Sequence, residues 1–138
     1  MIIIVDTNII FAALRSKNAA YRKQLLSSEH SYYCPNFLIV EIFKHKERIL
    51  IKSKADDAEV YEFLNKLQQK IHFVNESIIS IGSIKEAYKL CKDVDEKDTP
   101  FIALALELKA TVWTQDKKLI NGISKKGFKS FVTVYPPL

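Results

Sequence analysis

The 138-residue chain contains few of the residues that mark loop-rich or disulfide-bonded proteins. It has two cysteines, three glycines and four prolines. Two cysteines in apolar surroundings are too few for a disulfide scaffold and indicate reduced, packed thiols. So few glycines and prolines leave little room for long flexible linkers, and no internal repeat or shift in composition marks a boundary. We therefore expect a single domain over residues 1–138.

The chain also lacks long hydrophobic runs. No segment approaches the roughly 20 apolar residues that a membrane-spanning helix needs. The apolar first residues have no basic region before them and include Asp6, which does not fit a secretory signal peptide. The three histidines are scattered, and none lies at a spacing typical of zinc ligands. These absences predict a cytoplasmic protein with no membrane segment.

What the sequence does contain is an alternation of short apolar strands and helices. Strands are expected at 2–5, 31–34, 71–74, 111–114 and 131–135. Helices are expected over 8–28 (as one or two segments), 37–53, 56–70, 83–92, 98–109 and 117–123. This order predicts an α/β fold of three layers, with helices on both faces of a short, mainly parallel five-stranded sheet. In such sheets ligands bind at the carboxyl ends of the strands, which makes acids at those ends informative.

Four acids occupy positions of this kind. Asp6 follows the first strand and Asp116 follows the strand at 111–114. Asp98 opens the apolar helix "DTPFIALALEL", and Glu41 interrupts the apolar run "FLIVEIF". Each has an ordinary explanation, because the three aspartates can cap helices and Glu41 can pair with Lys44 or His45.

Considered together, the four acids favour a different explanation. Like charges gathered without basic partners repel one another and require a cation. Oxygen ligands alone suit Mg²⁺ or Mn²⁺ better than zinc. Such ions bind phosphates and activate water for attack at phosphorus. The acids therefore predict a divalent-metal site that acts on a phosphate ester.

The charge balance is compatible with a nucleic-acid partner. The chain has 21 Lys and Arg against 16 Asp and Glu, a net charge of +5. Basic side chains around an acidic pocket can hold a nucleic-acid backbone, although many proteins are this basic for solubility alone. The candidates are Arg15, Lys17, Arg22, Lys23, the basic residues between Lys44 and Lys54, Lys117, Lys118, Lys125 and Lys126.

In the order and spacing of its motifs the chain resembles the PIN-domain nucleases. The resemblance rests on "VDTNII" at 5–10, Glu41 in its helix, "DEKDTPFIALALEL" at 95–108 and "WTQDKKL" at 113–119. It implies an α/β/α sandwich, a divalent-metal site and cleavage of RNA to leave a 5′-phosphate. The acids that match the family's metal site are Asp6, Glu41, Asp98 and Asp116, and the polar positions that help to hold them or their water match Thr7, Asn8 and Thr114.

The same resemblance implies partners. Many bacterial and archaeal members are VapC-type toxins, usually homodimers, that a small antitoxin protein inhibits.

This chain differs from the family's motif at one position and has an additional acid at another. Lys118 stands where many members have a further acid, which weakens the case for a second metal. Asp95, three residues before Asp98, either contributes a ligand or is a charged loop residue.

The sequence thus predicts a Mg²⁺- or Mn²⁺-dependent endoribonuclease in which water activated by the metal hydrolyses the phosphodiester. Asp6, Asp98 and Asp116 are expected to hold the metal and Glu41 to position the ion or the water. The main alternative is a catalytically silent PIN-like module that binds RNA or a protein. A phosphatase of the haloacid dehalogenase type needs an acid where this chain has Asn8, and a receiver domain needs an acid pair near the first strand.

Overall fold

The computed structural model of the chain describes residues 1–15, 19–27, 29–52 and 56–132. Its regular elements follow one another in the order that the sequence predicts. They are β1 (Ile2–Val5), α1 (Thr7–Arg15), α2 (Ala19–Leu26), β2 (Ser31–Pro35), α3 (Phe37–Lys52), α4 (Asp57–Lys70), β3 (His72–Val74), the short 3-10 turn η1 (Glu76–Ile78), α5 (Ile81–Cys91), the 3-10 turn η2 (Glu96–Asp98), α6 (Thr99–Leu108), β4 (Thr111–Trp113) and α7 (Lys117–Ser124).

The four strands form one parallel sheet in the order β3-β2-β1-β4. β1 lies inside the sheet, with β2 on one side and β4 on the other. Its Ile3, Ile4 and Val5 are completely buried, as expected for a parallel strand covered on both faces. Parallel pairing brings the carboxyl ends of β1, β2 and β4 to one edge of the sheet.

The sheet has four strands among the described residues rather than the five predicted. The segment expected as a fifth strand, 131–135, meets the sheet through a single parallel bridge between Phe131 and Val112. Val112 donates to Ser130 O at 2.8 Å and accepts from Val132 N at 2.9 Å. β4 is only three residues long, which leaves little ladder to extend, and residues 133–135 lie outside the described part of the chain.

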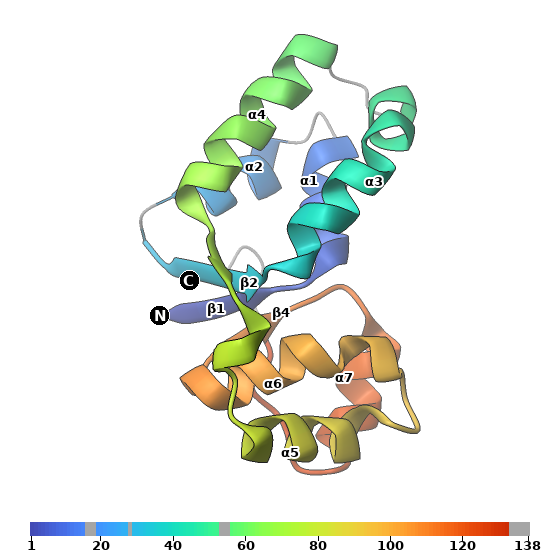
Figure 1. The fold of residues 1–138 in the computed structure, drawn as a ribbon. Helices are drawn as coiled ribbons and strands as arrows, with labels where there is room; N and C mark the ends of the chain where they lie inside the picture. The colour runs from blue at the N-terminus through green and yellow to red at the C-terminus, as the bar shows by residue number, and fades with distance from the viewer. Residues whose placement is uncertain (16–18, 28, 53–55, 133–138) are drawn as a thin grey trace.

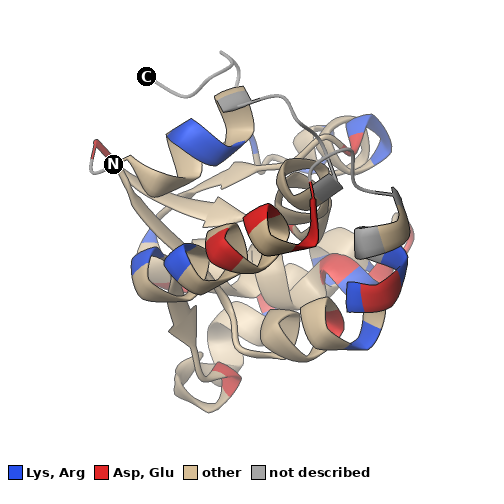
Figure 2. Ribbon diagram, turned by 90° about the horizontal axis from the view of Figure 1, so that it is seen from above, with Lys and Arg blue, Asp and Glu red and all other residues tan. Residues whose placement is uncertain are grey.

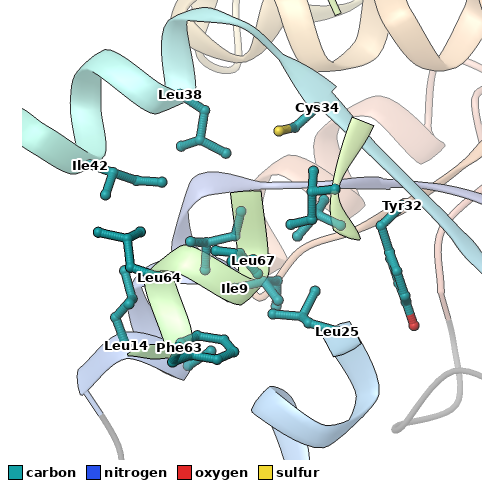
Figure 3. Close-up of a cluster of buried hydrophobic side chains, with 14 of the residues drawn as sticks. Ile9, Leu14, Leu25, Tyr32, Cys34, Leu38, Ile42, Phe63, Leu64 and Leu67 are labelled. Atoms are coloured by element: carbon teal, nitrogen blue, oxygen red, sulfur yellow. The ribbon is translucent and has the colours of Figure 1, made fainter. Parts of the chain in front are cut away.

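Helices cover both faces of the sheet and give the three layers that the sequence predicts (Figure 1). α1 to α4 pack on one face against Ile3 and Val5, in a cluster that also holds Leu38 and Leu67 (Figure 3). α5, α6 and α7 pack on the other face, where Ile4 points. The side chains of β1 separate in this way because successive residues of a strand face opposite sides.

α6 is the most deeply buried helix of the second layer. Its residues Phe101 to Ala105 are all buried, because this helix is apolar on nearly every side and packs between the sheet and α5. It ends at Lys109, which adopts the left-handed conformation with φ 52°. The buried helix holds its first turn firmly at the edge of the sheet where the strands end. None of the described helices is both long and apolar enough to span a membrane.

Candidate functional site

A cleft of about 750 Å³ lies at the carboxyl edge of the sheet. It receives side chains from the ends of β1 and β4, from α1 and α3, and from the segment that leads into α6. The four acids predicted from the sequence all line this cleft: Asp6, Glu41, Asp98 and Asp116. Elements of both helical layers meet here, so residues far apart in the sequence share one site.

Asp6 is the most deeply placed of the acids, with 6% of its surface exposed. Its Oδ1 accepts from the backbone N–H of Thr7 at 2.7 Å, and its Oδ2 accepts from the Thr114 hydroxyl at 2.6 Å. Burial raises the pKa of Asp6, whereas the hydrogen bonds from Thr114 and Thr7 oppose that rise. The carboxylate is therefore held in one orientation at the end of the central strand.

Thr114 and Asn8 form the network that holds Asp6. The Thr114 hydroxyl donates to Asp6 and accepts from Asn8 Nδ2 and from the backbone N–H of Asp116, both at 3.1 Å. This uses the one donor and both acceptors of a hydroxyl group. Asn8 Nδ2 also donates to Asp6 Oδ2 at 3.1 Å, and Asn8 Oδ1 accepts from the backbone N–H of Gln115 at 3.1 Å. The network ties the end of β1 to the end of β4.

Asp116 acts as an ordinary helix cap. Its Oδ1 accepts from the backbone N–H of Leu119 at 3.1 Å, at the start of α7. This is the hydrogen bond expected of an N-cap aspartate. The second carboxyl oxygen of Asp116 remains for other partners in the cleft, so capping and ligation are compatible at this residue.

Asp98 behaves differently, although it also stands directly before a helix. Its side chain makes no capping hydrogen bond to α6, and its buried Oδ2 has no hydrogen-bond partner among the described residues. Burial is the main cause that raises the pKa of Asp98 to about 7. The charges of Asp6, Asp95 and Asp116 act in the same direction. The explanation of Asp98 as a helix cap is therefore wrong.

Glu41 and Asp95 line the cleft from opposite sides and each has a partner. Glu41 Oε2 lies 3.4 Å from His45 Nε2, one turn later on α3. Of the basic neighbours considered for Glu41 in the sequence, the structure thus selects His45. Asp95 Oδ1 accepts from the backbone N–H of Lys97 at 3.0 Å and caps the turn η2. Asp95 has a structural role, and it also lies in the cleft.

The donor set fits a hard divalent cation in its chemistry. The acids of the cleft offer carboxylate oxygens, which are the ligands that such a cation prefers. One of these oxygens, Oδ2 of Asp98, has no hydrogen-bond partner among the described residues. No three His, Cys, Asp or Glu side chains in the described part of the chain are placed to hold one metal ion directly. A cation bound here would therefore need water to complete its coordination, as Mg²⁺ commonly does.

Two of the basic residues named as candidates for holding a nucleic-acid backbone make hydrogen bonds within the protein. Arg22 donates to Ala13 O at 2.7 Å and to Leu14 O at 3.1 Å, and its guanidinium lies 5.1 Å from the ring centroid of Phe63. Lys126 donates to the backbone oxygens of Lys89 and Leu90 and to Asp93 Oδ1. Both side chains hold helix ends in place.

Basic residues also occur on several helices. In the view of Figure 2, basic and acidic segments are interspersed over these helices. Lys44 lines the cleft, whereas Lys17 and Lys54 lie outside the described residues. Lys97, which the sequence reasoning did not single out, also lines the cleft. Its position directly before Asp98 in the sequence could have indicated that Lys97 lies near the cleft.

Comparisons with known proteins agree with this architecture. A family model described as the PIN domain matches residues 4–133. The crystal structure of VapBC2 from Rickettsia felis, bound to a DNA fragment from their promoter, is similar to this chain with a TM-score of 0.59. The two are 18% identical, and the similarity covers 86% of this chain and 90% of the other. At this identity the likeness establishes a shared fold.

A search of curated protein sequences found no match to the chain. The family match nevertheless spans nearly the whole sequence and includes the four cleft acids that the sequence predicted. The resemblance noted in the sequence is confirmed at the level of the family. The chain belongs to the PIN domain family.

Proposed function

We propose that the protein is a divalent-metal-dependent endoribonuclease, with Asp6, Glu41, Asp98 and Asp116 as its active-site acids. The observation that carries the proposal is the state of Asp98. Its Oδ2 is buried without a partner, close enough to Asp6 and Asp116 for their charges to raise its pKa. Such an arrangement is unfavourable for the protein alone and becomes favourable when a cation is shared between the carboxylates.

The residues of the cleft would have different roles in the hydrolysis of a phosphodiester. Asp6, Asp98 and Asp116 would hold Mg²⁺ or Mn²⁺, directly or through water, and Glu41 would position the ion or the attacking water. A bound divalent ion supplies charge neutralisation at the phosphate and an acidified water for the attack at phosphorus. Thr114 and Asn8 keep Asp6 in one orientation, so that little reorganisation is needed when substrate binds.

We further propose that the protein is the toxin of a toxin–antitoxin pair, with a small antitoxin protein as its partner and RNA as its substrate. The motifs of the sequence resemble VapC-type members, and the similar solved structure carries the name VapBC2. A homodimer belongs to the same proposal. Controlled expression in bacteria tests it: the wild type should arrest growth, and Asp98→Asn should not. Equal growth of both strains would contradict the toxin role.

The nuclease activity has a direct test. The purified protein should cleave a mixed pool of labelled RNA when Mn²⁺ or Mg²⁺ is present and lose this activity in EDTA. Asp6→Ala should remove the metal-dependent cleavage, because the central carboxylate of the cleft is lost. A variant that cleaved RNA as well as the wild type would contradict the assignment of the site.

One observation favours a second candidate, a silent PIN-like module that binds RNA or protein. Within the described residues no three potential ligands are placed to hold one metal ion directly. Such a module would retard labelled RNA in a gel shift, or bind a protein, without producing shorter fragments. The cleavage assay therefore distinguishes the two candidates, since only the nuclease shortens the RNA in a metal-dependent manner.

A further inference from the structure

Two cationic side chains, Lys44 and Lys97, line the acidic cleft. Neither of them forms an ion pair within the part of the chain that the structure describes. Both residues are exposed, so each ammonium group can reach a ligand in the cleft at little cost. They differ in this respect from Arg22 and Lys126, whose donors are used by helix ends.

The two lysines come from opposite walls of the cleft. Lys44 lies on α3, one turn after Glu41, and α3 belongs to the layer formed by α1 to α4 (Figure 1). Lys97 lies in η2, which leads into α6 in the other layer. The acids of the sheet edge lie between them. Asp95 accepts from the backbone of Lys97 rather than from its ammonium group, which leaves that group available.

The charge of the cleft explains why such lysines are needed. Six acids line it against these two lysines: Asp6, Glu41, Asp95, Glu96, Asp98 and Asp116. A polyanionic strand that enters the cleft is repelled by these carboxylates. A bound cation relieves the repulsion chiefly at the phosphates nearest to it, because the field of an ion is screened over about 10 Å at 0.1 M salt. Phosphates further along the strand require cations of their own.

We propose that Lys44 and Lys97 bind phosphates of the substrate strand on either side of the acids. They are substrate-binding residues, one on each wall, and together they set the path of the strand across the cleft. This inference rests on the proposed nuclease function, since it describes how the same cleft receives its substrate. The inference assigns phosphate binding to these two lysines rather than to a broad basic surface.

The experiment measures binding of a fluorescently labelled single-stranded RNA by anisotropy. The full chain carries Asp98→Asn, so that RNA is bound in the presence of Mg²⁺ but not cut. Affinity is measured over a range of NaCl concentrations. For a single strand, the slope of log K against log salt changes by about 0.7 for each phosphate contact. Lys44→Ala with Lys97→Ala should therefore reduce the slope by about 1.4.

Matched variants make the result specific to the cleft. Lys85→Ala with Lys129→Ala removes two exposed lysines that do not line the cleft and should leave the slope unchanged. Lys44→Arg with Lys97→Arg should keep the wild-type slope, because both charges remain. Circular dichroism should show the same fold for every variant. Equal slopes for the two alanine pairs, or no measurable binding of RNA by any protein, would overturn the inference.

Kinetics on the chain with Asp98 intact separate this inference from the nuclease function itself. In the lysine-to-alanine pair KM should rise about tenfold or more, as expected for the loss of two phosphate contacts, while kcat changes little. If the wild type fails to cut RNA but the two alanine pairs differ in slope, the nuclease function fails and the role of the lysines stands. If the wild type cuts RNA and the pairs do not differ, only the role of the lysines fails.

Discussion

Asp98 and Asp116 each stand directly before a helix, and the two helix starts use their aspartates in opposite ways. Asp116 caps the start of α7, where its carboxylate accepts a hydrogen bond from Leu119 N–H. Asp98 makes no such bond to α6, and one of its oxygens is buried without a described partner. The pKa of Asp98 is raised to about 7, chiefly by burial.

The difference shows what a helix start can reveal about function. An aspartate that caps a helix stabilises the fold, so its place before the helix does not by itself indicate a function. An aspartate at the same position that does not cap, and that lies among other carboxylates, costs the fold stability. Such a residue is a candidate for function, because perturbed acids in a cleft are often retained for the ligand that they bind.

The largest expected effect is on activity, and here the two aspartates should behave alike. Asp98→Asn and Asp116→Asn should each lower metal-dependent RNA cleavage by about 100-fold or more, because each removes a carboxylate that holds the cation, and the cation stabilises the transition state. Initial rates with labelled RNA in Mn²⁺ measure this. Lys85→Ala, outside the cleft, serves as the control. A fully active Asp116→Asn would mean that Asp116 is a cap and nothing more.

The next effect separates metal binding from catalysis. At a concentration of Mg²⁺ or Mn²⁺ about 100 times its Kd, the wild type should gain about 2.7 kcal/mol in the free energy of unfolding. Asp98→Asn should gain clearly less, because it lacks the carboxylate whose charge the ion would neutralise. Urea unfolding with and without the metal provides the measurement. An equal gain in both proteins would show that Asp98 is not a ligand.

Without metal, Asp98 should destabilise the fold at high pH. Its pKa is about 7 in the folded protein against a usual value of 3.8. The folded protein therefore holds a proton between these values that the unfolded chain releases, and stability falls as the pH rises through this range. In EDTA at pH 8, Asp98→Asn should be more stable than the wild type by about 1–2 kcal/mol, a figure reduced for the partial exposure of the carboxyl group.

The same variant should show no advantage at pH 4, where the carboxyl group of the wild type is already protonated. Unfolding by urea at pH 4 and pH 8 makes the comparison. Burial also raises the pKa of Asp6, so the wild type keeps part of this pH trend when Asp98 is replaced. The same difference between Asp98→Asn and the wild type at both pH values would contradict the explanation.

The smallest effect is the loss of the cap at α7. Asp116→Ala should lower the free energy of unfolding by about 1 kcal/mol, because the N–H of Leu119 loses its partner. Asp116→Asn should retain most of that stability, since asparagine caps helices as well as aspartate does. Asp98→Ala should cause no such loss. A loss of stability in Asp98→Ala would remove the distinction between the two helix starts.

Much of the fold was predictable from local patterns. β1 is a continuous apolar run, which is typical of a strand that is buried on both faces. α4 has apolar residues spaced by three or four positions, which is typical of a helix with one apolar face. A β-branched segment near Phe131 favours a fifth strand in the sequence. The described part of that segment forms only one bridge, to Val112, because pairing depends on how much of β4 is available beside it. The hydrogen bonds of Arg22 could not be predicted for a similar reason, since the carbonyl groups that accept them lie nine and eight residues earlier, in α1.

By itself, the sequence determined the order of strands and helices and the family, because periodicity and motifs can be recognised without knowing which residues are in contact. It also named the four acids. The tertiary structure alone decided which of them cap helices and which do not, that His45 is the partner of Glu41, and that Lys44 and Lys97 face the same cleft. These outcomes depend on the tertiary contacts that form when both helical layers pack on the sheet. Contacts between residues far apart in the sequence leave no local pattern in the chain.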